Sequence, residues 1–189
     1  MSTWSPDAWL DAWTFASVVH QGQLLPGSQL PYIVHIAAVA MEVAGAISLR
    51  ALSGDPVADP DLAITVALLH DTVEDTDTTV EEIAARFGPA VAAGVSALSK
   101  NPAVGDKPAQ MQDSLARIRE QPREVWMVKL ADRINNLKEP PGYWTPDKIR
   151  RYGEEAGVIL ATLGEACPIL APRLRVKIAE YEPHARRGS

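Results

Sequence analysis

The sequence predicts an all-α fold in a single compact, multi-helix domain. No stretch alternates apolar and polar residues with the period of two that half-buried strands show. Helix-start signals, in which a capping side chain precedes a proline, recur along the chain instead. The chain has 189 residues, of which 47% are hydrophobic and 22% charged, a size and balance typical of one soluble globular domain.

The first half of the chain predicts three helices, at about 6–20, 34–50 and 60–71. Ser5-Pro6 and Asp59-Pro60 each place a capping side chain before a proline in the first helical turn, where the missing N–H costs nothing. Gly and Pro residues between 22 and 31 predict a loop after the first helix. His35 falls in the first turn of the second helix.

The second half continues the helical pattern. A capping box, Thr78 with Glu81 or Thr79 with Glu82, precedes a short helix that Gly88-Pro89 interrupts. A loop is expected at 101–108, and Pro140-Pro141-Gly142 forces another break. The later helices are expected at about 90–98, 109–121, 122–138, 146–165 and 168–181. The domain therefore extends over 1–189, with about 183–189 as a loose C-terminal tail.

Charge and cysteine usage limit the classes of partner. The formal charge of −6 gives no support to a nucleic-acid or anionic-membrane surface, since both need a basic footprint. The richest apolar run, 34–47, is interrupted by His35 and Glu42, so no membrane span is expected. A lone Cys167 fits a reducing compartment. Together with the lack of a signal peptide in MSTWSPDAWLDAW, this predicts a cytoplasmic protein.

The segment LLHDTVEDT, residues 68–76, predicts a metal site. His70 and Asp71 follow an apolar run and offer one nitrogen and one oxygen to the same point, a pair suited to a divalent metal. His35 and Asp132 end up in similarly apolar surroundings, where a carboxylate is costly unless it is paired or metal-bound. For His35 the alternative is a buried, hydrogen-bonded imidazole, and for Asp132 it is an ion pair with Lys129 or Arg133. Together the four residues form a ligand set of two His and two Asp from three helices.

Glu74 and Asp75 predict acid–base chemistry beside the metal. At about 100° per residue, Glu74 lies one helical turn beyond His70 and Asp75 one turn beyond Asp71. Such spare carboxylates can orient a water molecule or carry its proton. The alternative is a solvated acidic helix end, although acidic groups at a helix C-terminus oppose the helix dipole.

The motif H35, H70-D71 and D132 resembles that of HD-domain metal-dependent phosphohydrolases. More narrowly, HQGQ with PYIVH, LLHDTVEDT and KLADRINNL resemble the hydrolase domain of RelA/SpoT enzymes and the small alarmone hydrolases, over about Trp9 to Leu163. This resemblance implies an all-helical HD-type domain that binds one divalent metal, usually manganese. It also implies removal of the 3′-pyrophosphate of the small-molecule substrate (p)ppGpp, with release of pyrophosphate.

The resemblance also implies a role for individual residues. The metal ligands would be His35, His70, Asp71 and Asp132. Glu74 and Asp75 would activate the water, and Asn136 would help to position the water or the substrate. Lys100 would face substrate phosphates, and Tyr152 would line the nucleotide pocket.

The sequence departs from the family pattern at the expected base contacts. Leu24 and Leu25 stand where the family commonly has Arg and Lys, and Ile36 follows the ligand histidine where the family has Pro. Leucine keeps apolar contact with a base but lacks the charge of a guanidinium, which predicts tolerance of adenosine as well as guanosine alarmones, (p)ppApp as well as (p)ppGpp. Two alternatives stay open: an HD phosphohydrolase acting on other nucleotides, and a nucleotide-binding module without turnover.

Overall fold

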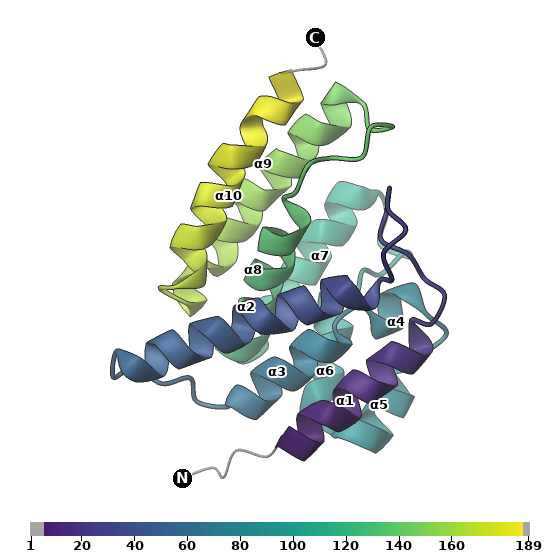
Figure 1. The fold of residues 1–189 in the computed structure, drawn as a ribbon, viewed down its shortest axis with the longest axis vertical. Coiled ribbons are helices and arrows are strands. Elements are labelled where there is room, and N and C mark those ends of the chain that lie inside the picture. Colours follow the sequence, from purple (N-terminus) through teal and green to yellow (C-terminus); the bar gives the residue numbers. More distant parts are fainter. Residues whose placement is uncertain (1–5, 187–189) are drawn as a thin grey trace.

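Helix α8 (Arg123–Asn136) lies at the centre of the molecule, and the other helices pack around it (Figure 1). The computed structural model of the protein describes residues 6–186. Every residue of α8 from Glu124 to Ile134 is buried. Helices α2 (Ile33–Leu52) and α3 (Pro60–Leu69) pack against α8 and against each other, and α10 (Leu170–Arg186) also contacts α8. This arrangement brings the three helices that carry the predicted metal ligands together.

The remaining elements complete an all-helical domain, as predicted. They are α1 (Pro6–Val19), α4 (Thr72–Asp75), α5 (Val80–Phe87), α6 (Pro89–Leu98), α7 (Lys107–Arg119), α9 (Pro146–Leu163) and the 3₁₀ turn η1 (Gly164–Ala166). Helix α1 packs on α3, α5 on α6, and α9 on α10. Within residues 6–186 the β-pairing consists of one isolated antiparallel bridge between Leu24 and Pro31.

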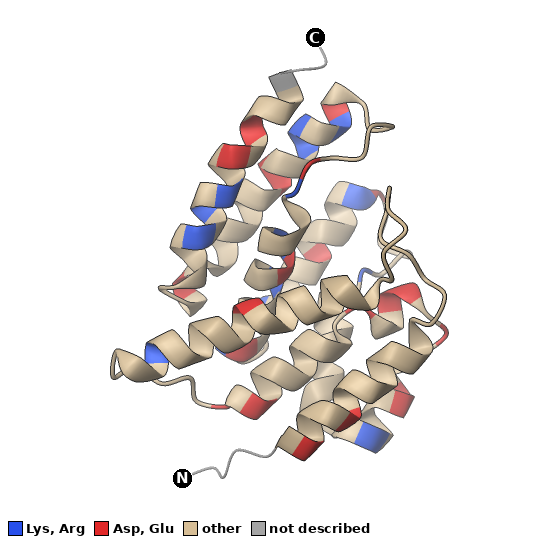
Figure 2. Ribbon diagram, viewed as in Figure 1, with Lys and Arg blue, Asp and Glu red and all other residues tan. Residues whose placement is uncertain are grey.

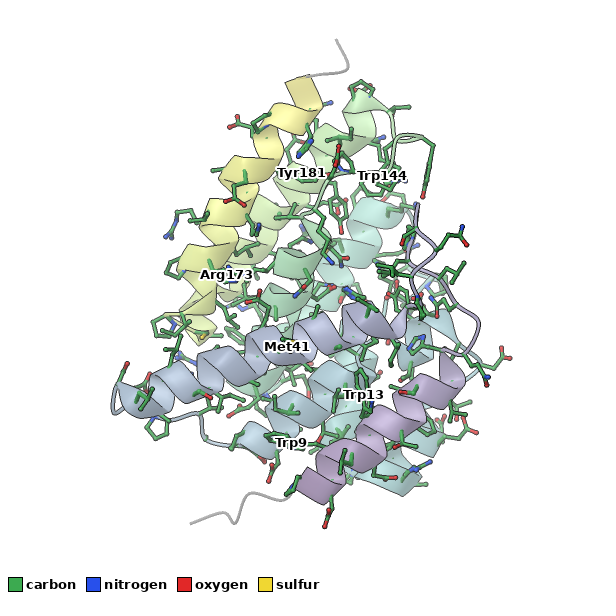
Figure 3. The ribbon with its side chains drawn as sticks, viewed as in Figure 1. Trp9, Trp13, Met41, Trp144, Arg173 and Tyr181 are labelled. Carbon is green, nitrogen blue, oxygen red and sulfur yellow. The ribbon has the colours of Figure 1, made fainter. Side chains whose placement is uncertain are left out.

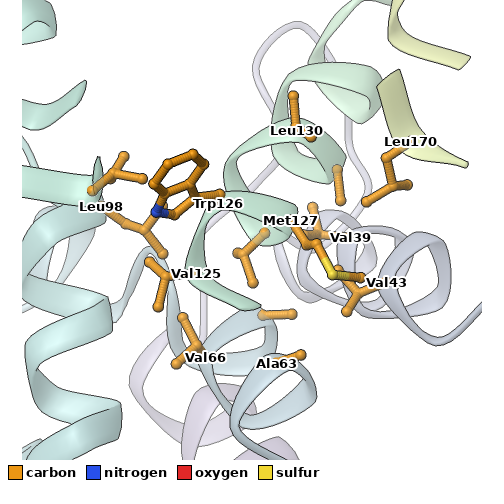
Figure 4. Close-up of a cluster of buried hydrophobic side chains, with 14 of the residues drawn as sticks. Val39, Val43, Ala63, Val66, Leu98, Val125, Trp126, Met127, Leu130 and Leu170 are labelled. Carbon is orange, nitrogen blue, oxygen red and sulfur yellow. The ribbon is translucent and has the colours of Figure 1, made fainter. Parts of the chain in front are cut away.

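A single buried hydrophobic cluster joins the helices from α1 to α10. Figure 4 shows its centre, where side chains of α2, α3, α6, α8 and α10 meet: Val39, Val43, Ala63, Val66, Leu98, Val125, Trp126, Met127, Leu130 and Leu170. Gly94 lets α6 approach closely, because a Cβ there would lie 3.0 Å from side-chain atoms of Val66 and Val125. The core thus fixes the relative positions of α2, α3 and α8.

Several predicted helix starts are confirmed by their capping hydrogen bonds. Asp59 accepts from the backbone N–H of Leu62, and Thr145 accepts from Lys148. Of the two possible capping boxes, the structure forms Thr79 with Glu82. These side chains satisfy backbone N–H groups that an α-helix leaves without an internal partner.

Some predicted boundaries are shifted. Helix α7 begins at Lys107, inside the expected loop, because Asp106 caps it through the N–H of Ala109. The tail expected from residue 183 is helical as far as Arg186, and Pro183 lies inside α10, whose Tyr181 packs in the core. Residues 187–189 of that tail and the Ser5 cap lie outside the described residues.

Helix α2 is long and apolar enough, by length and composition, to cross a membrane. It nevertheless packs on α3 and α8 within the domain and supplies His35 to the ligand set. Its outward face carries exposed apolar side chains, among them Met41 and Leu49. The core helix of a globular protein passes the same composition test, and 28% of the apolar window of α2 is buried within the domain.

Lys and Arg are more frequent on the C-terminal helices than on the N-terminal ones (Figure 2). Helices α9 and α10 carry several basic residues, whereas α1, α3 and α4 carry acidic ones. The acidic residues of α4 lie beside the predicted metal ligands. A polyanionic substrate there needs a cation to offset this negative charge.

Candidate metal centre

The four predicted metal ligands converge where α2, α3 and α8 meet. His35 Nε2 lies 3.4 Å from Asp71 Oδ2 and 3.4 Å from Asp132 Oδ1. His70 Nε2 lies 3.1 Å and 3.9 Å from the same two oxygens. Since metal–ligand bonds of about 2.0–2.2 Å place neighbouring ligand atoms roughly 3 Å apart, these separations fit one shared cation.

The two histidine nitrogens that face the carboxylates of Asp71 and Asp132 form no hydrogen bond with the described residues. Nε2 of His35 and Nε2 of His70 are both buried without a hydrogen-bond partner. His70 Nδ1 lies 2.8 Å from the carbonyl oxygen of Ala67. Because a carbonyl only accepts, Nδ1 carries the proton, and Nε2 of the neutral ring presents a lone pair. Buried lone pairs facing carboxylate oxygens are the donor set that a divalent cation requires.

The site concentrates negative charge in a buried place. Burial lowers the pKa of His35, but attraction to Asp132 and Asp71 outweighs burial and raises this pKa to about 9. Burial raises the pKa of Asp71, yet the adjacent His70 and His35 bring it well below its usual range. Ligand atoms of His35, His70 and Asp71 all lie within 4.8 Å of one another. The same electrostatic potential that retains protons on imidazoles favours a bound cation.

Asp132 forms an ion pair through one carboxylate oxygen and faces the histidines with the other. Its Oδ2 accepts from Lys129 Nζ at 3.1 Å, so the ion pair that the sequence offered as an alternative is present. Its Oδ1 faces His35 and accepts from Asn136 Nδ2 at 2.5 Å. Burial raises the pKa of Asp132, and Lys129 followed by His35 more than reverses this effect. The two oxygens of Asp132 therefore have separate roles: Oδ2 pairs with Lys129, and Oδ1 can still bind a metal ion.

The helix predicted at about 60–71 ends slightly earlier, so the helical spacing assumed from His70 to Asp75 is interrupted. Helix α3 ends at Leu69, and α4 begins at Thr72. Thr72 Oγ1 donates to the carbonyl oxygen of Leu69 at 2.7 Å, a local side-chain bond that competes with the helical ladder. Asp75 N still donates to Asp71 O at 2.9 Å, so these two residues keep the predicted spacing of one turn.

Glu74 is paired with Lys100. Lys100 Nζ lies 2.5 Å from Glu74 Oε1, and the backbone N–H of Lys100 donates to Glu74 Oε2 at 3.0 Å. Burial lowers the pKa of Lys100, but Glu74 more than offsets this and raises it, so the ammonium stays charged. The two residues that the sequence assigned to water activation and phosphate contact thus lie side by side.

Asp75 and Asp71 each receive a hydrogen bond from the loop between α1 and α2. Gln23 Nε2 donates to Asp75 Oδ2 at 3.1 Å, and Tyr32 Oη donates to Asp71 Oδ2 at 2.6 Å. Burial and then the charge of Asp71 raise the pKa of Asp75. Burial and Asp71 also raise the pKa of Tyr32, which keeps its hydroxyl protonated as a donor.

Tyr152 is held in place by contacts with Arg133 and Trp144. The guanidinium of Arg133 lies 4.1 Å from the Tyr152 ring centroid and donates to the Tyr152 carbonyl oxygen at 3.3 Å. Trp144 meets the ring edge-on at 5.2 Å, and Figure 3 shows Trp144 and Tyr181 at the same end of the molecule. Arg133 follows Asp132 directly on α8, so the same helix carries a proposed metal ligand and the guanidinium that holds Tyr152.

Leu24 and Leu25 lie on the same loop as Gln23 and Tyr32. Leu24 has 45% of its surface exposed, whereas Leu25 is half-buried and its N–H donates to the carbonyl oxygen of Leu30. The Tyr32 N–H donates to the Gln23 carbonyl oxygen at 2.9 Å. The loop that carries Leu24 and Leu25 is therefore anchored to the acidic residues Asp71 and Asp75.

Gln23 and Tyr32 were missed as site residues in the sequence. Both lie in segments that carried the family resemblance, HQGQ and PYIVH, but glutamine and tyrosine have no metal-ligand spacing that would single them out. His20, in HQGQ, is buried and lies 2.6 Å from Gln23 through Nδ1 and Oε1. Their positions depend on the fold of the loop, which no periodic pattern encodes.

Comparison with known proteins places the chain in a family. Residues 12–169 match the family described as "HD domain". The chain is 31% identical over 159 residues to the zebrafish (Danio rerio) protein named guanosine-3′,5′-bis(diphosphate) 3′-pyrophosphohydrolase MESH1, covering 82% of this chain and 83% of that one. It is 34% identical over 175 residues to the Myxococcus xanthus protein named GTP pyrophosphokinase, covering 86% of this chain.

The chain spans only 21% of the length of that Myxococcus protein, so the match concerns one part of it. A solved structure described as a metazoan ortholog of SpoT that hydrolyses ppGpp superposes with a TM-score of 0.76 at 21% sequence identity. The superposition covers 95% of this chain and 98% of the other. The chain therefore belongs to the HD domain family and is related within it to the MESH1 hydrolases and the hydrolase domains of SpoT and RelA.

Proposed function

We propose that the protein is a metal-dependent hydrolase that removes the 3′-pyrophosphate of guanosine alarmones, (p)ppGpp. The observation that carries the proposal is the convergence of two unpartnered histidine nitrogens with oxygens of Asp71 and Asp132. The zebrafish relative, which matches over most of both chains, is named for this reaction. Manganese is the proposed metal because the family resemblance implies it, and the two carboxylates of the set suit it.

His35, His70, Asp71 and Asp132 would hold the cation. When bound, it supplies Lewis acidity, which polarises a phosphoryl oxygen and makes water more acidic. Tyr32 and Asn136 would orient the ligand carboxylates, because each donates to an oxygen that faces the histidines. Lys129 would hold the second oxygen of Asp132 away from the ligand position.

Asp75 and Glu74 would manage the proton of the attacking water. In the proposed reaction, water attacks the phosphorus attached to the ribose 3′-oxygen, and the bond between this phosphorus and the 3′-oxygen breaks. The ribose oxygen takes a proton, and pyrophosphate and the nucleoside 5′-phosphates are the products. Asp75 is the better placed base, since Gln23 donates to its Oδ2 and holds the carboxylate in place. Glu74 would act together with Lys100, with which it is paired.

Lys100 would contact substrate phosphates from its place beside Glu74. An ammonium that stays charged and borders the acidic residues can offset the charge of the incoming pyrophosphate. Tyr152 would line the nucleotide pocket, with Arg133 over its ring. A cytoplasmic location agrees with the one cysteine, Cys167, which is buried as a free thiol.

Leu24 and Leu25 lead us to propose that adenosine alarmones are substrates too. Apolar contact does not distinguish guanine from adenine, and an apolar wall rejects close analogues poorly. We expect kcat/KM for ppApp within about tenfold of that for ppGpp, or roughly 1.4 kcal/mol in transition-state binding. Side-by-side kinetics with manganese measure this ratio. A thousandfold preference for guanine would refute the tolerance while leaving the hydrolase assignment intact.

Product analysis tests the proposed activity. Purified protein with manganese is expected to convert ppGpp to GDP and pyrophosphate, and chelation with EDTA should stop the reaction. The His70→Ala variant serves as the control for contaminating phosphatases. A folded, metal-loaded protein that releases orthophosphate from deoxynucleoside monophosphates, and nothing from ppGpp, would instead support an HD phosphohydrolase of other nucleotides.

A further inference from the structure

A chain of two hydrogen bonds leads from a buried histidine outside the ligand set to Asp75. His20 Nδ1 lies 2.6 Å from Gln23 Oε1, and Gln23 Nε2 donates to Asp75 Oδ2 at 3.1 Å. His20 is 3% exposed, and its Nε2 is buried without a hydrogen-bond partner among the described residues. The imidazole therefore has a single polar contact, and that contact is the amide of Gln23.

The direction of these bonds follows from chemistry. An ionised carboxylate only accepts, so the amide NH₂ of Gln23 must face Asp75 and its carbonyl oxygen must face His20. The carbonyl oxygen also only accepts, so His20 Nδ1 carries the proton and donates. If Gln23 were turned over, its carbonyl would face the carboxylate of Asp75. His20 thus selects the one amide orientation that gives Asp75 a donor.

The backbone holds this chain in place. The N–H of Gln23 donates to the carbonyl oxygen of His20 at 3.0 Å, which closes a turn just after α1. Gly22 in that turn has a φ of +83°, a backbone conformation that residues with a side chain rarely adopt. The His20 ring also packs against Tyr32, with centroids 5.1 Å apart. The histidine is therefore fixed on both its ring face and its Nδ1 edge.

We propose that His20 and Gln23 are positioning residues for the reaction, which hold the carboxylate of Asp75 in the orientation that the reaction needs. The inference rests on the proposed function, because it takes Asp75 as the base. Groups that orient a functional side chain through hydrogen bonds commonly contribute roughly 10–100-fold to activity or metal affinity. Here the effect is expected in kcat, because the chain of hydrogen bonds leads from His20 through Gln23 to Asp75, the proposed base.

Paired variants at His20 test the donor. His20→Phe keeps a ring against Tyr32 but removes the donor, and should lower kcat for ppGpp by about tenfold or more, with KM and bound manganese unchanged. His20→Asn places an amide N–H near the Nδ1 position and should restore most of kcat. Equal losses in the two variants, or a loss in KM alone, would overturn the proposal.

A double-mutant cycle tests whether the two residues act in series. Gln23→Met removes both hydrogen bonds at similar length, and the double variant with His20→Phe should be no slower than Gln23→Met alone. Multiplying losses would show that His20 acts by another route. Thermal unfolding and metal content of each variant distinguish lost positioning from lost folding. If the wild-type protein turned over no ppGpp, the proposed function itself would fail; if it did and His20→Phe matched it, only this inference would.

Discussion

His70 has two ring nitrogens with different roles, and these roles predict which variants lose the metal and which lose only activity. Nδ1 donates to Ala67, which leaves Nε2 for the cation. His70→Ala should therefore lose the metal together with activity. Glu74→Gln should keep the metal and the fold while activity falls by roughly 10², the usual range for a positioned acid–base group. Metal analysis beside turnover measures both. If Glu74→Gln emptied the site as fully as His70→Ala, Glu74 would have to be a ligand.

Asp75 is predicted to lower the stability of the folded protein at pH 7 while supporting its activity. Its pKa is raised in the folded protein, so the folded state holds its proton to higher pH than the unfolded state does. The contribution of Asp75 to stability is thus fully present below the unfolded pKa and is lost as pH rises through the folded pKa. At pH 7 the ionised carboxylate, close to the charge of Asp71, destabilises the folded state, and asparagine removes this charge.

The variant Asp75→Asn should therefore unfold at a higher temperature than the wild-type protein at pH 7, when both are metal-free, while activity falls by roughly 10² or more. Melting curves at pH 7 and at pH 3, where the difference should shrink, measure the effect. A destabilised Asp75→Asn at pH 7 would mean that its hydrogen bond from Gln23 outweighs the burial of charge.

At the scale of the elements, the cap of α3 offers a clean prediction. Asp59 accepts from the Leu62 N–H at 2.9 Å and begins the helix that ends at the metal centre. Asp59→Ala should lower the free energy of unfolding by about 1 kcal/mol, the usual contribution of an N-cap. Asp59→Asn, which keeps an accepting oxygen, should cost much less. Denaturant titration measures both, and equal losses would show that the charge of Asp59 matters rather than its cap.

Most helices could be predicted because their starts are encoded locally. The side chains of Asp59, Thr79 and Thr145 each accept a hydrogen bond from the backbone N–H three residues later. The capping signal is therefore contained in a few consecutive residues. The break between α3 and α4 could not be predicted, because His70 and Asp71 themselves have helical or near-helical dihedrals and only the Thr72 side chain marks the interruption.

The convergence of the four proposed metal ligands could be predicted for a similar reason. Histidine and aspartate in apolar helical runs are costly, and a shared cation explains them together. Gln23 and Tyr32 could not be predicted. Their contacts with Asp75 and Asp71 span 52 and 39 residues of sequence and depend on an irregular loop with one isolated bridge.

At the scale of the molecule, the proposed metal centre lies where the consecutive helices α2 and α3 meet α8, which comes much later in the sequence. A cation bound by His35, His70, Asp71 and Asp132 would link α2, the end of α3 and α8, and would bind only the folded chain. Saturating manganese at about 100 times its dissociation constant should stabilise the protein by about 2.7 kcal/mol. Melting with manganese or with EDTA measures this shift. His70→Ala should melt alike in both, and an equal manganese shift in that variant would place the metal elsewhere.

The most direct test of the account is hydrolysis of ppGpp in ¹⁸O-labelled water by the manganese-loaded protein. Attack of water on the phosphorus next to the ribose predicts GDP without label and pyrophosphate carrying one ¹⁸O, with His70→Ala inactive. Mass spectrometry of both products reads the outcome. Label in the nucleoside, orthophosphate in place of pyrophosphate, or no turnover by a folded, metal-loaded protein would contradict the assignment of this site as a 3′-pyrophosphohydrolase.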